Sequence, residues 1–337
     1  MYASMQRTAG AILVTAAFVL PLSNAQAHNF CVSTAAQLQS ALHDAGSGGA
    51  YNNESNIIRV VKGTYKTGSA TGNGPFYYYS TNGGHMDLYG GYNAGCTSTS
   101  WNATQTVLDG NNATQVLSLY SRVGEVDVVG FTIQNGYTDQ PGAGVTINGY
   151  ANLAGAAIVI GNIVRNNHST TGGGGVNVYA GIGNLLLLAN NVIVDNIADQ
   201  GVGAGFAVGN GDESLIYNNT VSGNTGVTDL GGLFLNGQAN TYVINNIFWN
   251  NTYEGLRADS ANVLAFDYND YGTVILGNVP ENIGNLSVPP QFVNRNAGNY
   301  HLAAGSPLID ASPDSFGFHD PDGNTGSGAM ENIGAYH

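Results

Sequence analysis

Short apolar runs that end in asparagine recur along the middle of the chain. Residues 185–196 show the pattern, with four leucines and an alanine, the pair Asn190-Asn191, then Val-Ile-Val before Asp195 and Asn196. Four copies of the motif Asn-x-(aliphatic or Phe)-x-x-Asn close at Asn167, Asn196, Asn224 and Asn251. Successive closing asparagines are 29, 28 and 27 residues apart, and a fainter copy spans residues 130–136. A fixed period of this length is typical of a repeat architecture.

Each repeat holds three short strands and no helix. A glycine-rich turn and a first strand, such as 176–178, follow the closing asparagine. A second strand, such as 186–189, leads to the asparagine pair. The asparagine motif itself is the third strand. Parallel strands normally need a long crossover, unless the chain coils so that each strand pairs with its equivalent one turn later. We therefore predict an all-β fold, a right-handed parallel β-helix with three-strand rungs of about 27–31 residues. The alternatives, a propeller or a sandwich, would show a rhythm of Asn-Gly or Asp-Gly hairpin turns that these repeats lack.

Aligned columns of the repeats indicate which side chains face the interior. Eight residues before each closing asparagine stand Val159, Leu188, Ile216 and Val243, and three before it stand Val164, Ile193, Val221 and Phe248. We expect these aliphatic columns to stack inside the coil. A neighbouring column, Ile158, Leu187, Leu215 and Tyr242, is also apolar, so we expect a loop or a partner to cover its outer face. The amides at the strand corners can hydrogen-bond from rung to rung, as asparagine ladders do in stacked parallel sheets.

The two ends of the chain differ from the regular repeats. Residues 33–44 have a cap residue and apolar positions at helical spacing, which predicts a helix that closes the end of the solenoid. We assign 28–130 to an N-terminal cap with irregular first rungs, 131–275 to regular rungs and 276–337 to a closing segment, all within one domain. Tyr77-Tyr78-Tyr79 and Trp101 are interpreted as packing or cap aromatics, with a ligand role as the weaker alternative.

The first residues have the pattern of an export signal. Arg7 precedes an apolar stretch, 9–22, that ends in Ala25-Gln26-Ala27, so we predict a signal peptide over 1–27 and a mature chain without a transmembrane segment. The location is then a bacterial periplasm, an outer membrane or cell surface, or the medium. Cys31 and Cys96, the chain's two cysteines, are expected to form one disulfide in such a compartment.

Charge excludes two classes of partner. The chain has 8 Lys or Arg against 22 Asp or Glu, and a net charge of −14. Nucleic acids and anionic membrane surfaces both need many basic residues, so neither is an expected partner. We expect a monomer that engages a polysaccharide or a cell-surface partner.

Two stretches near the start and three at the end resemble a known family. Gly90-Gly-Tyr-Asn-Ala-Gly-Cys96 and Thr106-Val-Leu-Asp-Gly110 resemble the entry segment of secreted bacterial β-helix repeat proteins of the pectate-lyase-like superfamily, some of them of the polymorphic outer-membrane type. The closing stretches 290–293, 305–311 and 333–336 resemble the C-terminal pattern of choice-of-anchor β-helix proteins. The resemblance implies the β-helix fold and an extracellular location. Since this fold hosts lyases, hydrolases, epimerases, esterases and adhesins, function must be argued from a site.

The outer face of the first strand in each rung is the usual groove wall in that superfamily. Strand alternation points six side chains outward there, and we predict that they form a sugar-binding strip: Asn177, Tyr179, Phe234, Asn236, Arg257 and Asp259. Arg257 and Asp259 are weak catalytic candidates. The alternative is a solvated face with an Arg257–Asp259 surface pair worth roughly 0–1 kcal/mol.

Other groups give weaker signals for chemistry. Asp320, Asp322 and Asn324 could hold Ca²⁺ through oxygen ligands, although an Asp-Gly turn explains the loop as well. Two carboxylates could hydrolyse a glycoside, and the pairs that the sequence offers are Asp195 with Asp199, Asp267 with Asp270, and Asp212 with Glu213. No cofactor is expected apart from that calcium ion. We therefore expect a non-catalytic protein that binds carbohydrate or a cell-surface partner along the solenoid side, with a polysaccharide lyase or another carbohydrate-active enzyme acting on acidic polysaccharide as the alternative.

Overall fold

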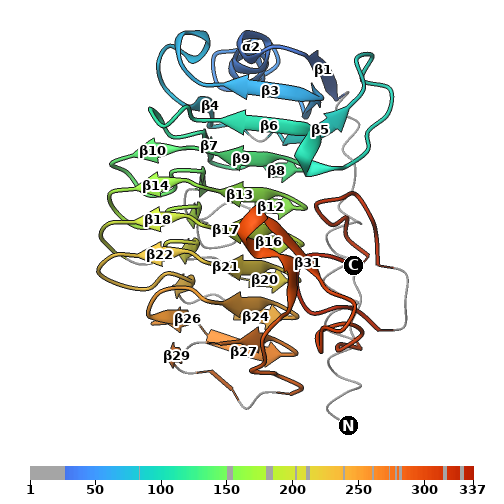
Figure 1. Cartoon of the computed structure of the whole chain (residues 1–337). Helices are drawn as coiled ribbons and strands as arrows, with labels where there is room; N and C mark the ends of the chain where they lie inside the picture. The colour runs from blue at the N-terminus through green and yellow to red at the C-terminus, as the bar shows by residue number, and fades with distance from the viewer. Residues whose placement is uncertain are drawn as a thin grey trace.

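The computed structural model describes residues 27–82, 84–149, 155–179, 185–201, 203–209, 213–237, 240–259, 262–272, 274–277, 279–280, 283–313, 317–326 and 330–337. Nearly all of the expected signal peptide, residues 1–26, lies outside these ranges. Within them the chain forms a parallel β-solenoid of about seven turns (Figure 1), so the predicted parallel β-helix is confirmed.

Three long parallel sheets, which we call A, B and C, form the walls of the described solenoid. Sheet A contains β1 (His28–Val32), β2 (Asn56–Val61), β5 (Met86–Tyr92), β8 (Val126–Val129), β12 (Ala156–Ile160), β16 (Leu185–Ala189), β20 (Glu213–Tyr217), β24 (Asn240–Ile244) and β27 (Asn262–Asp267). Sheet B contains β3 (Gly63–Lys66), β6 (Thr106–Asp109), β9 (Thr132–Gln134), β13 (Ile163–Arg165), β17 (Val192–Val194), β21 (Thr220–Ser222), β25 (Ile247–Trp249) and β28 (Asp270–Tyr271). Sheet C contains β4 (Phe76–Ser80), β7 (Leu117–Ser121), β11 (Val145–Gly149), β15 (Val176–Tyr179), β19 (Phe206–Gly209), β23 (Leu233–Asn236), β26 (Glu254–Ala258) and β29 (Val274–Gly277).

A fourth, short sheet was not predicted. Sheet D contains β10 (Tyr137–Thr138), β14 (His168–Ser169), β18 (Ile197–Ala198) and β22 (Thr225–Gly226), so the middle rungs have four strands where the sequence indicated three. Each of these strands has two residues, too few to show the alternation by which a strand is recognised in a sequence.

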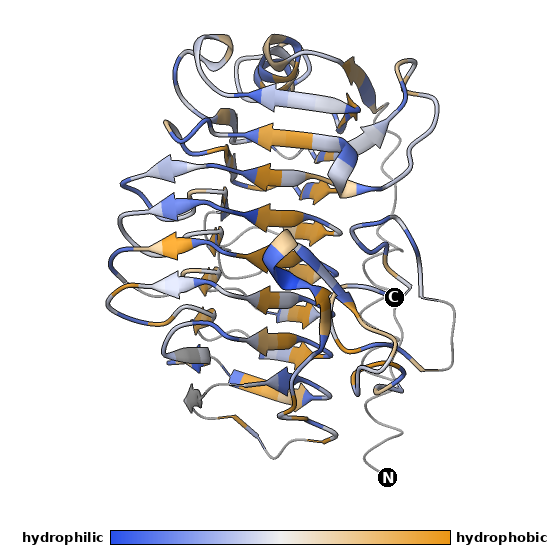
Figure 2. Cartoon of the chain, viewed as in Figure 1, coloured by the Kyte–Doolittle hydropathy of each residue, from blue (hydrophilic) through white to orange (hydrophobic). Residues whose placement is uncertain are grey.

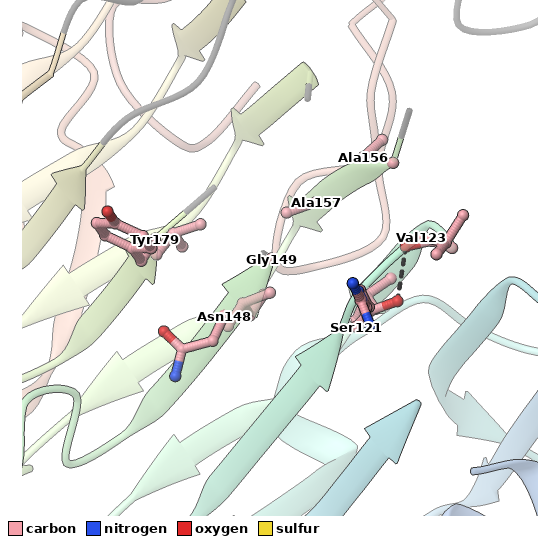
Figure 3. Close-up of a pocket in the computed structure, with 13 residues that line it drawn as sticks. Ser121, Val123, Asn148, Gly149, Ala156, Ala157 and Tyr179 are labelled. Atoms are coloured by element: carbon pink, nitrogen blue, oxygen red, sulfur yellow. Dashed lines mark hydrogen bonds between the residues drawn. The ribbon is translucent and has the colours of Figure 1, made fainter. Parts of the chain in front are cut away.

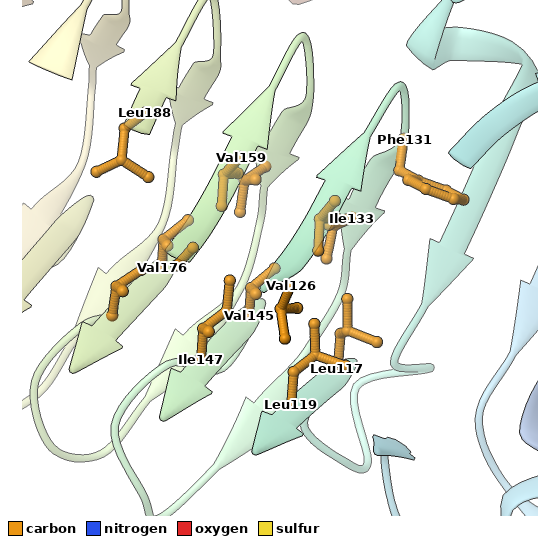
Figure 4. Close-up of a cluster of buried hydrophobic side chains, with 14 of the residues drawn as sticks. Leu117, Leu119, Val126, Phe131, Ile133, Val145, Ile147, Val159, Val176 and Leu188 are labelled. Atoms are coloured by element: carbon orange, nitrogen blue, oxygen red, sulfur yellow. The ribbon is translucent and has the colours of Figure 1, made fainter. Parts of the chain in front are cut away.

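The predicted interior columns are buried. Val159, Leu188, Ile216 and Val243 from sheet A are at most 2% exposed, and so are Val164, Ile193, Val221 and Phe248 from sheet B. Figure 4 shows Val159 and Leu188 facing Val145 and Val176 of sheet C across the interior. The hydropathy of the strands agrees with this burial, since apolar strands stack one above another along the solenoid (Figure 2). Because each side chain packs on its equivalent in the next rung, the core is continuous from end to end.

The corner asparagines form two buried ladders. Asn162, Asn191, Asn219, Asn246 and Asn269 stack at the corner between sheets A and B, and Asn167, Asn196, Asn224 and Asn251 stack after sheet B. In each step one amide Nδ2 donates to the Oδ1 of the asparagine one rung further on, at 3.0–3.1 Å. The predicted rung-to-rung bonding is therefore present, and it satisfies polar groups that the corners bury.

The two ends of the chain form structure outside the regular rungs. Helix α2 (Ala35–Ala45) begins at the N-cap Thr34 and buries Leu38 and Leu42 against the first rung, as predicted. The expected disulfide joins Cys31 to Cys96. The closing segment forms the antiparallel pair β30 (Phe292–Asn294) and β31 (Asn299–Leu302) and then lies along the outer faces of sheets A and B, in red in Figure 1. Three 3-10 turns, η1 (Ser69–Thr71), η2 (Ala103–Gln105) and η3 (Arg295–Ala297), complete the described elements. None of the helices in the described ranges has the length and apolar character needed to cross a membrane.

Candidate functional sites

The predicted strip lies on the outer face of sheet C. Val176 and Val178 point into the core, so the alternate residues Asn177 and Tyr179 point outward. The parallel register places Asn177, Phe234 and Arg257 in one outward column, and Tyr179 and Asn236 in the next. Asp259 follows β26 directly and is exposed. The structure thus brings the six predicted residues to one face.

The column of Tyr179 continues upward through Tyr120 to Tyr79, which the sequence pattern indicated as a packing residue. Register pairs Tyr79 with Tyr120, Tyr120 with Asn148, and Asn148 with Tyr179. The rings of Tyr79 and Tyr120 stack with centroids 4.7 Å apart and planes at 22°. Tyr79 is 39% exposed and Tyr179 47%, and Figure 3 shows Asn148 beside Tyr179 on the neighbouring strand. We call Tyr79, Tyr120, Asn148 and Tyr179 the tyrosine column.

Arg257, the weak catalytic candidate, is held in an ion pair. Its two terminal nitrogens lie 2.9 and 3.0 Å from the two carboxylate oxygens of Asp229, which belongs to the preceding turn. A bidentate pair fixes the guanidinium in place and keeps it charged. Arg257 is therefore better suited to donating hydrogen bonds to a ligand than to accepting a proton.

A second site, which no motif in the sequence indicated, is a pocket on the outer face of sheet A. Its volume is about 550 Å³. The outward residues Ile158, Leu187 and Leu215 of β12, β16 and β20 form its apolar floor, and residues 317–319 of the closing segment form one wall. This is the apolar column for which a cover was expected, and the closing segment supplies that cover through Phe318.

Three carboxyl groups cluster at this pocket; Glu125 and Asp127 line it, and Asp87 lies beside them. Asp87 of β5 and Asp127 of β8 are paired in the parallel register, and Glu125 stands two residues before Asp127 on the same face. One oxygen from each of the three groups lies within 4.8 Å of the others. Asp127 is only 8% exposed; its Oδ2 accepts a hydrogen bond from the Tyr89 hydroxyl at 3.2 Å, while its Oδ1 is buried without a donor among the described residues.

Burial and mutual repulsion change the protonation of these groups. Burial raises the pKa of Asp87 to about 6, and the charge of Glu125 adds to that shift. Burial also raises the pKa of Glu125, and it raises the pKa of Asp127 well above the usual range, where the charges of Asp87 and Glu125 act in the same direction. Like charges opposite each other on neighbouring strands repel. The cluster therefore holds protons or attracts a cation near neutral pH.

Aromatic rings form another wall of the sheet A pocket. Trp101 packs edge-to-face on Tyr89, with centroids 5.6 Å apart, and stacks on His319 at 5.2 Å with planes at 16°. The backbone of Trp101 is in the left-handed region, with φ of +54°. A non-glycine residue costs on the order of 1–3 kcal/mol there, and such strain is concentrated at functional sites.

The two aspartates of the predicted calcium loop are engaged within the chain. Asp320 is 1% exposed, and its Oδ1 accepts the backbone N–H groups of Asp322 and Asn324 at 2.9 and 2.8 Å. Asp322 lies 2.6 Å from Nε2 of His301. These contacts are those of the capped Asp-Gly turn that was the alternative interpretation.

The carboxylate pairs offered by the sequence also have structural bonds. Asp195 accepts from the Tyr300 hydroxyl at 3.1 Å, and Asp199 lies 2.9 Å from Nε2 of His168. Asp267 and Asp270 each accept a backbone N–H from the segment that follows β28. Asp212 lies outside the described residues.

The acidic cluster was missed because its members are far apart in the sequence and lie in the irregular first rungs. The signal that could have found it is the alignment of Met86-Asp87-Leu88 with Val126-Asp127-Val128, which places two acids in register on the outer face of adjacent strands. Comparison with family models, with curated proteins and with solved structures finds no match for the chain.

Proposed function

We propose that this protein is an extracellular, carbohydrate-binding β-solenoid that holds an extended neutral polysaccharide across the outer face of sheet C. The observation that carries the proposal is the tyrosine column, with the exposed rings of Tyr79 and Tyr179, the half-buried ring of Tyr120 and the amides beside them. Tyrosine rings offer apolar surface on which the C–H faces of sugar rings can pack. Amides such as Asn148, Asn177 and Asn236 can donate to and accept from sugar hydroxyls.

The spacing of the column suits a linear chain. Neighbouring strands in a sheet lie about 4.7–4.9 Å apart, so Tyr120 and Tyr179, which are two strands apart, present rings about 9–10 Å from each other. A ligand that lies along the stack of rungs can contact both rings. Solenoids commonly use such extended faces for binding.

Charge favours a neutral ligand. With a net charge of −14 the chain repels polyanions, and the one arginine of the predicted strip is paired with Asp229. A neutral polysaccharide avoids this repulsion and needs only stacking and hydrogen bonds.

Export belongs to the same proposal. The disulfide between Cys31 and Cys96 is compatible with an oxidising compartment, and the resemblance to secreted bacterial proteins of the pectate-lyase-like superfamily supports the same location. We expect the mature chain to begin at His28, which N-terminal sequencing of the exported protein checks.

Affinity electrophoresis against a panel of neutral and acidic polysaccharides, with and without Ca²⁺, tests the binding proposal. We expect retardation by at least one neutral polysaccharide and a loss of about tenfold or more in affinity for Tyr120→Ala with Tyr179→Ala, since two ring contacts contribute roughly 1–3 kcal/mol. The matched control is Tyr137→Ala, which removes a tyrosine 44% exposed on sheet D and should change affinity less than twofold. Retardation by acidic polysaccharides alone, or equal losses in both variants, would contradict the proposal. The same mixtures, assayed for new reducing or unsaturated ends, distinguish binding from cleavage.

A further inference from the structure

We propose that the pocket on sheet A binds an organic ammonium ion, a primary amine carried on an apolar or ring-shaped body, with the ammonium group held by Asp87, Glu125 and Asp127. The site is separate from the tyrosine column, so this proposal stands independently of the polysaccharide.

The electrostatics of the pocket select a cation. Glu125 and Asp127 line the pocket with Asp87 beside them, and none of the lining residues in the described part of the chain is a lysine or an arginine. His319 in the wall and His85 beside Asp87 and Glu125 are the nearby groups that can carry positive charge. An anionic ligand would meet repulsion here, whereas a cation relieves the repulsion among the carboxylates.

The geometry of the acids fits an ammonium group. A primary ammonium has three N–H donors, each forming bonds of about 2.7–2.9 Å to carboxylate oxygens. At tetrahedral angles, two such acceptors lie roughly 4.6 Å apart, and the three carboxyl groups here offer oxygens within 4.8 Å of one another. The buried Oδ1 of Asp127 lacks a donor among the described residues, so a bound ligand would supply the missing hydrogen bond.

The remainder of the pocket calls for an organic body on that ammonium. A volume of about 550 Å³ is in the range of small-molecule sites, roughly 300–1,000 Å³. A bare metal ion would account for the acids but would leave the aliphatic floor and the aromatic wall without a ligand. Ile158, Leu187 and Leu215 can pack against a hydrocarbon body, and the rings of Tyr89 and Trp101 attract a cation through their faces.

Binding should weaken in acid. The groups that face the ammonium are Asp87 and Tyr89 from β5, Glu125 and Asp127 from the β8 segment, His85 beside them and His319 from the closing segment. The carboxyl groups must ionise to hold the ligand, so amine binding releases protons and loses affinity as pH falls through about 6, where Asp87 takes up its proton.

Isothermal titration of the disulfide-bonded chain tests the proposal. The probes are cyclohexylammonium, 2-phenylethylammonium and 1,5-diaminopentane as chlorides, the neutral alcohol of matching shape for each, and CaCl₂ alone. At pH 7.5 we expect at least one amine to bind in 1:1 ratio, at least tenfold more tightly than its alcohol, with weaker binding at pH 5. Asp127→Asn should lower amine affinity at least tenfold and leave that of the alcohol within twofold.

The controls make the result decisive. Asp139→Asn removes an exposed acid that follows β10 of sheet D and does not line the pocket, so it should change neither affinity. Thermal unfolding verifies that Asp127→Asn is folded, and Glu125→Gln serves as a second variant. Binding of no amine in the panel, or equal binding of amine and alcohol, would overturn the proposal. So would micromolar binding of CaCl₂ that displaces the amine and disappears in Asp127→Asn, because the cluster would then be a metal site.

Discussion

Substitution of Asn219 by alanine should destabilise the solenoid more than the size of the side chain suggests. The Oδ1 of Asn219 accepts from the backbone N–H and from the amide Nδ2 of Asn191, both at 3.0 Å. Its own Nδ2 donates to the carbonyl oxygens of Leu188 and Tyr217 and to Oδ1 of Asn246, at 2.9–3.0 Å. Alanine removes all five bonds at a position that is 1% exposed.

The loss of stability comes from the buried polar groups that lose their hydrogen-bond partner. The backbone N–H of Asn191 loses its acceptor, and one of its two amide hydrogens does as well; each buried donor without a partner costs about 1–3 kcal/mol. The carbonyl oxygens lose one bond each, which adds less because a carbonyl has a second acceptor site. We expect the free energy of unfolding to fall by about 3–5 kcal/mol. Since each rung is stabilised mainly by its neighbours, the loss should also reduce the cooperativity of unfolding.

The adjacent residue provides a matched control. Asn218 is also fully buried, but among the described residues neither its amide oxygen nor its amide nitrogen has a hydrogen-bond partner, and its backbone φ is +51°. Asn218→Gly suits that left-handed backbone and removes no hydrogen bond of the side chain, so it should change stability by less than about 1 kcal/mol. Guanidinium chloride unfolding, followed by tryptophan fluorescence and by circular dichroism, measures both variants. A loss below 1 kcal/mol for Asn219→Ala, or equal losses for the two variants, would refute the claim that the ladder holds the rungs together.

Three further predictions concern the charge cluster, the disulfide and the C-terminus. The folded-state pKa of Asp87 is raised from 3.8 to about 6, so the folded chain binds this proton more tightly than the unfolded chain and stability falls as pH rises from about 4 to 6. Asp87→Asn should therefore raise the free energy of unfolding by about 1–3 kcal/mol at pH 7.5 and change it little at pH 4. A variant that is less stable than the native protein at pH 7.5 would contradict this. Reduction of the Cys31–Cys96 disulfide, which spans 65 residues, should lower the free energy of unfolding by about 4 kcal/mol, because a longer closed loop restricts the unfolded chain more. The change in unfolding midpoint with dithiothreitol measures this loss, and an unchanged midpoint in the reduced protein would contradict it. Burial by itself lowers the pKa of His337, but the hydrogen bond and charge of Glu331 outweigh burial and raise the pKa above 6.5. NMR titration should therefore show His337 titrating above 6.5, and Glu331→Gln should shift that pKa downward. An unchanged pKa in the variant would exclude this pairing.

The regular rungs could be predicted from the sequence because their spacing and their side chains repeat together. Val159 and Leu188, or Asn191 and Asn219, occupy the same place in successive copies, and stacking follows directly from that recurrence. A segment covering Ile158 and Leu187 was also predicted, because an apolar column on an outer face rarely stays exposed.

The pocket on sheet A could not be predicted, for three physical reasons. Asp87 and Asp127 lie in early rungs whose length varies, so no fixed period aligns them. Trp101 enters from a connection between strands, and Phe318 comes from a segment far along the chain. Contacts of this kind depend on how irregular segments pack, which no local pattern records. The tyrosine column was only half visible, because Tyr120 and Asn148 stand outside the clear repeats.

The sugar-binding role of the tyrosine column is tested by a crystal structure of the protein with an oligosaccharide of the neutral polysaccharide that retards it in electrophoresis. We expect a sugar chain lying across β7, β11 and β15 of sheet C, with one ring packed on Tyr120, a second on Tyr179, and Asn148 bonded to hydroxyls between them. A sugar chain bound on sheet B or sheet D, with the tyrosine column bare, would contradict it.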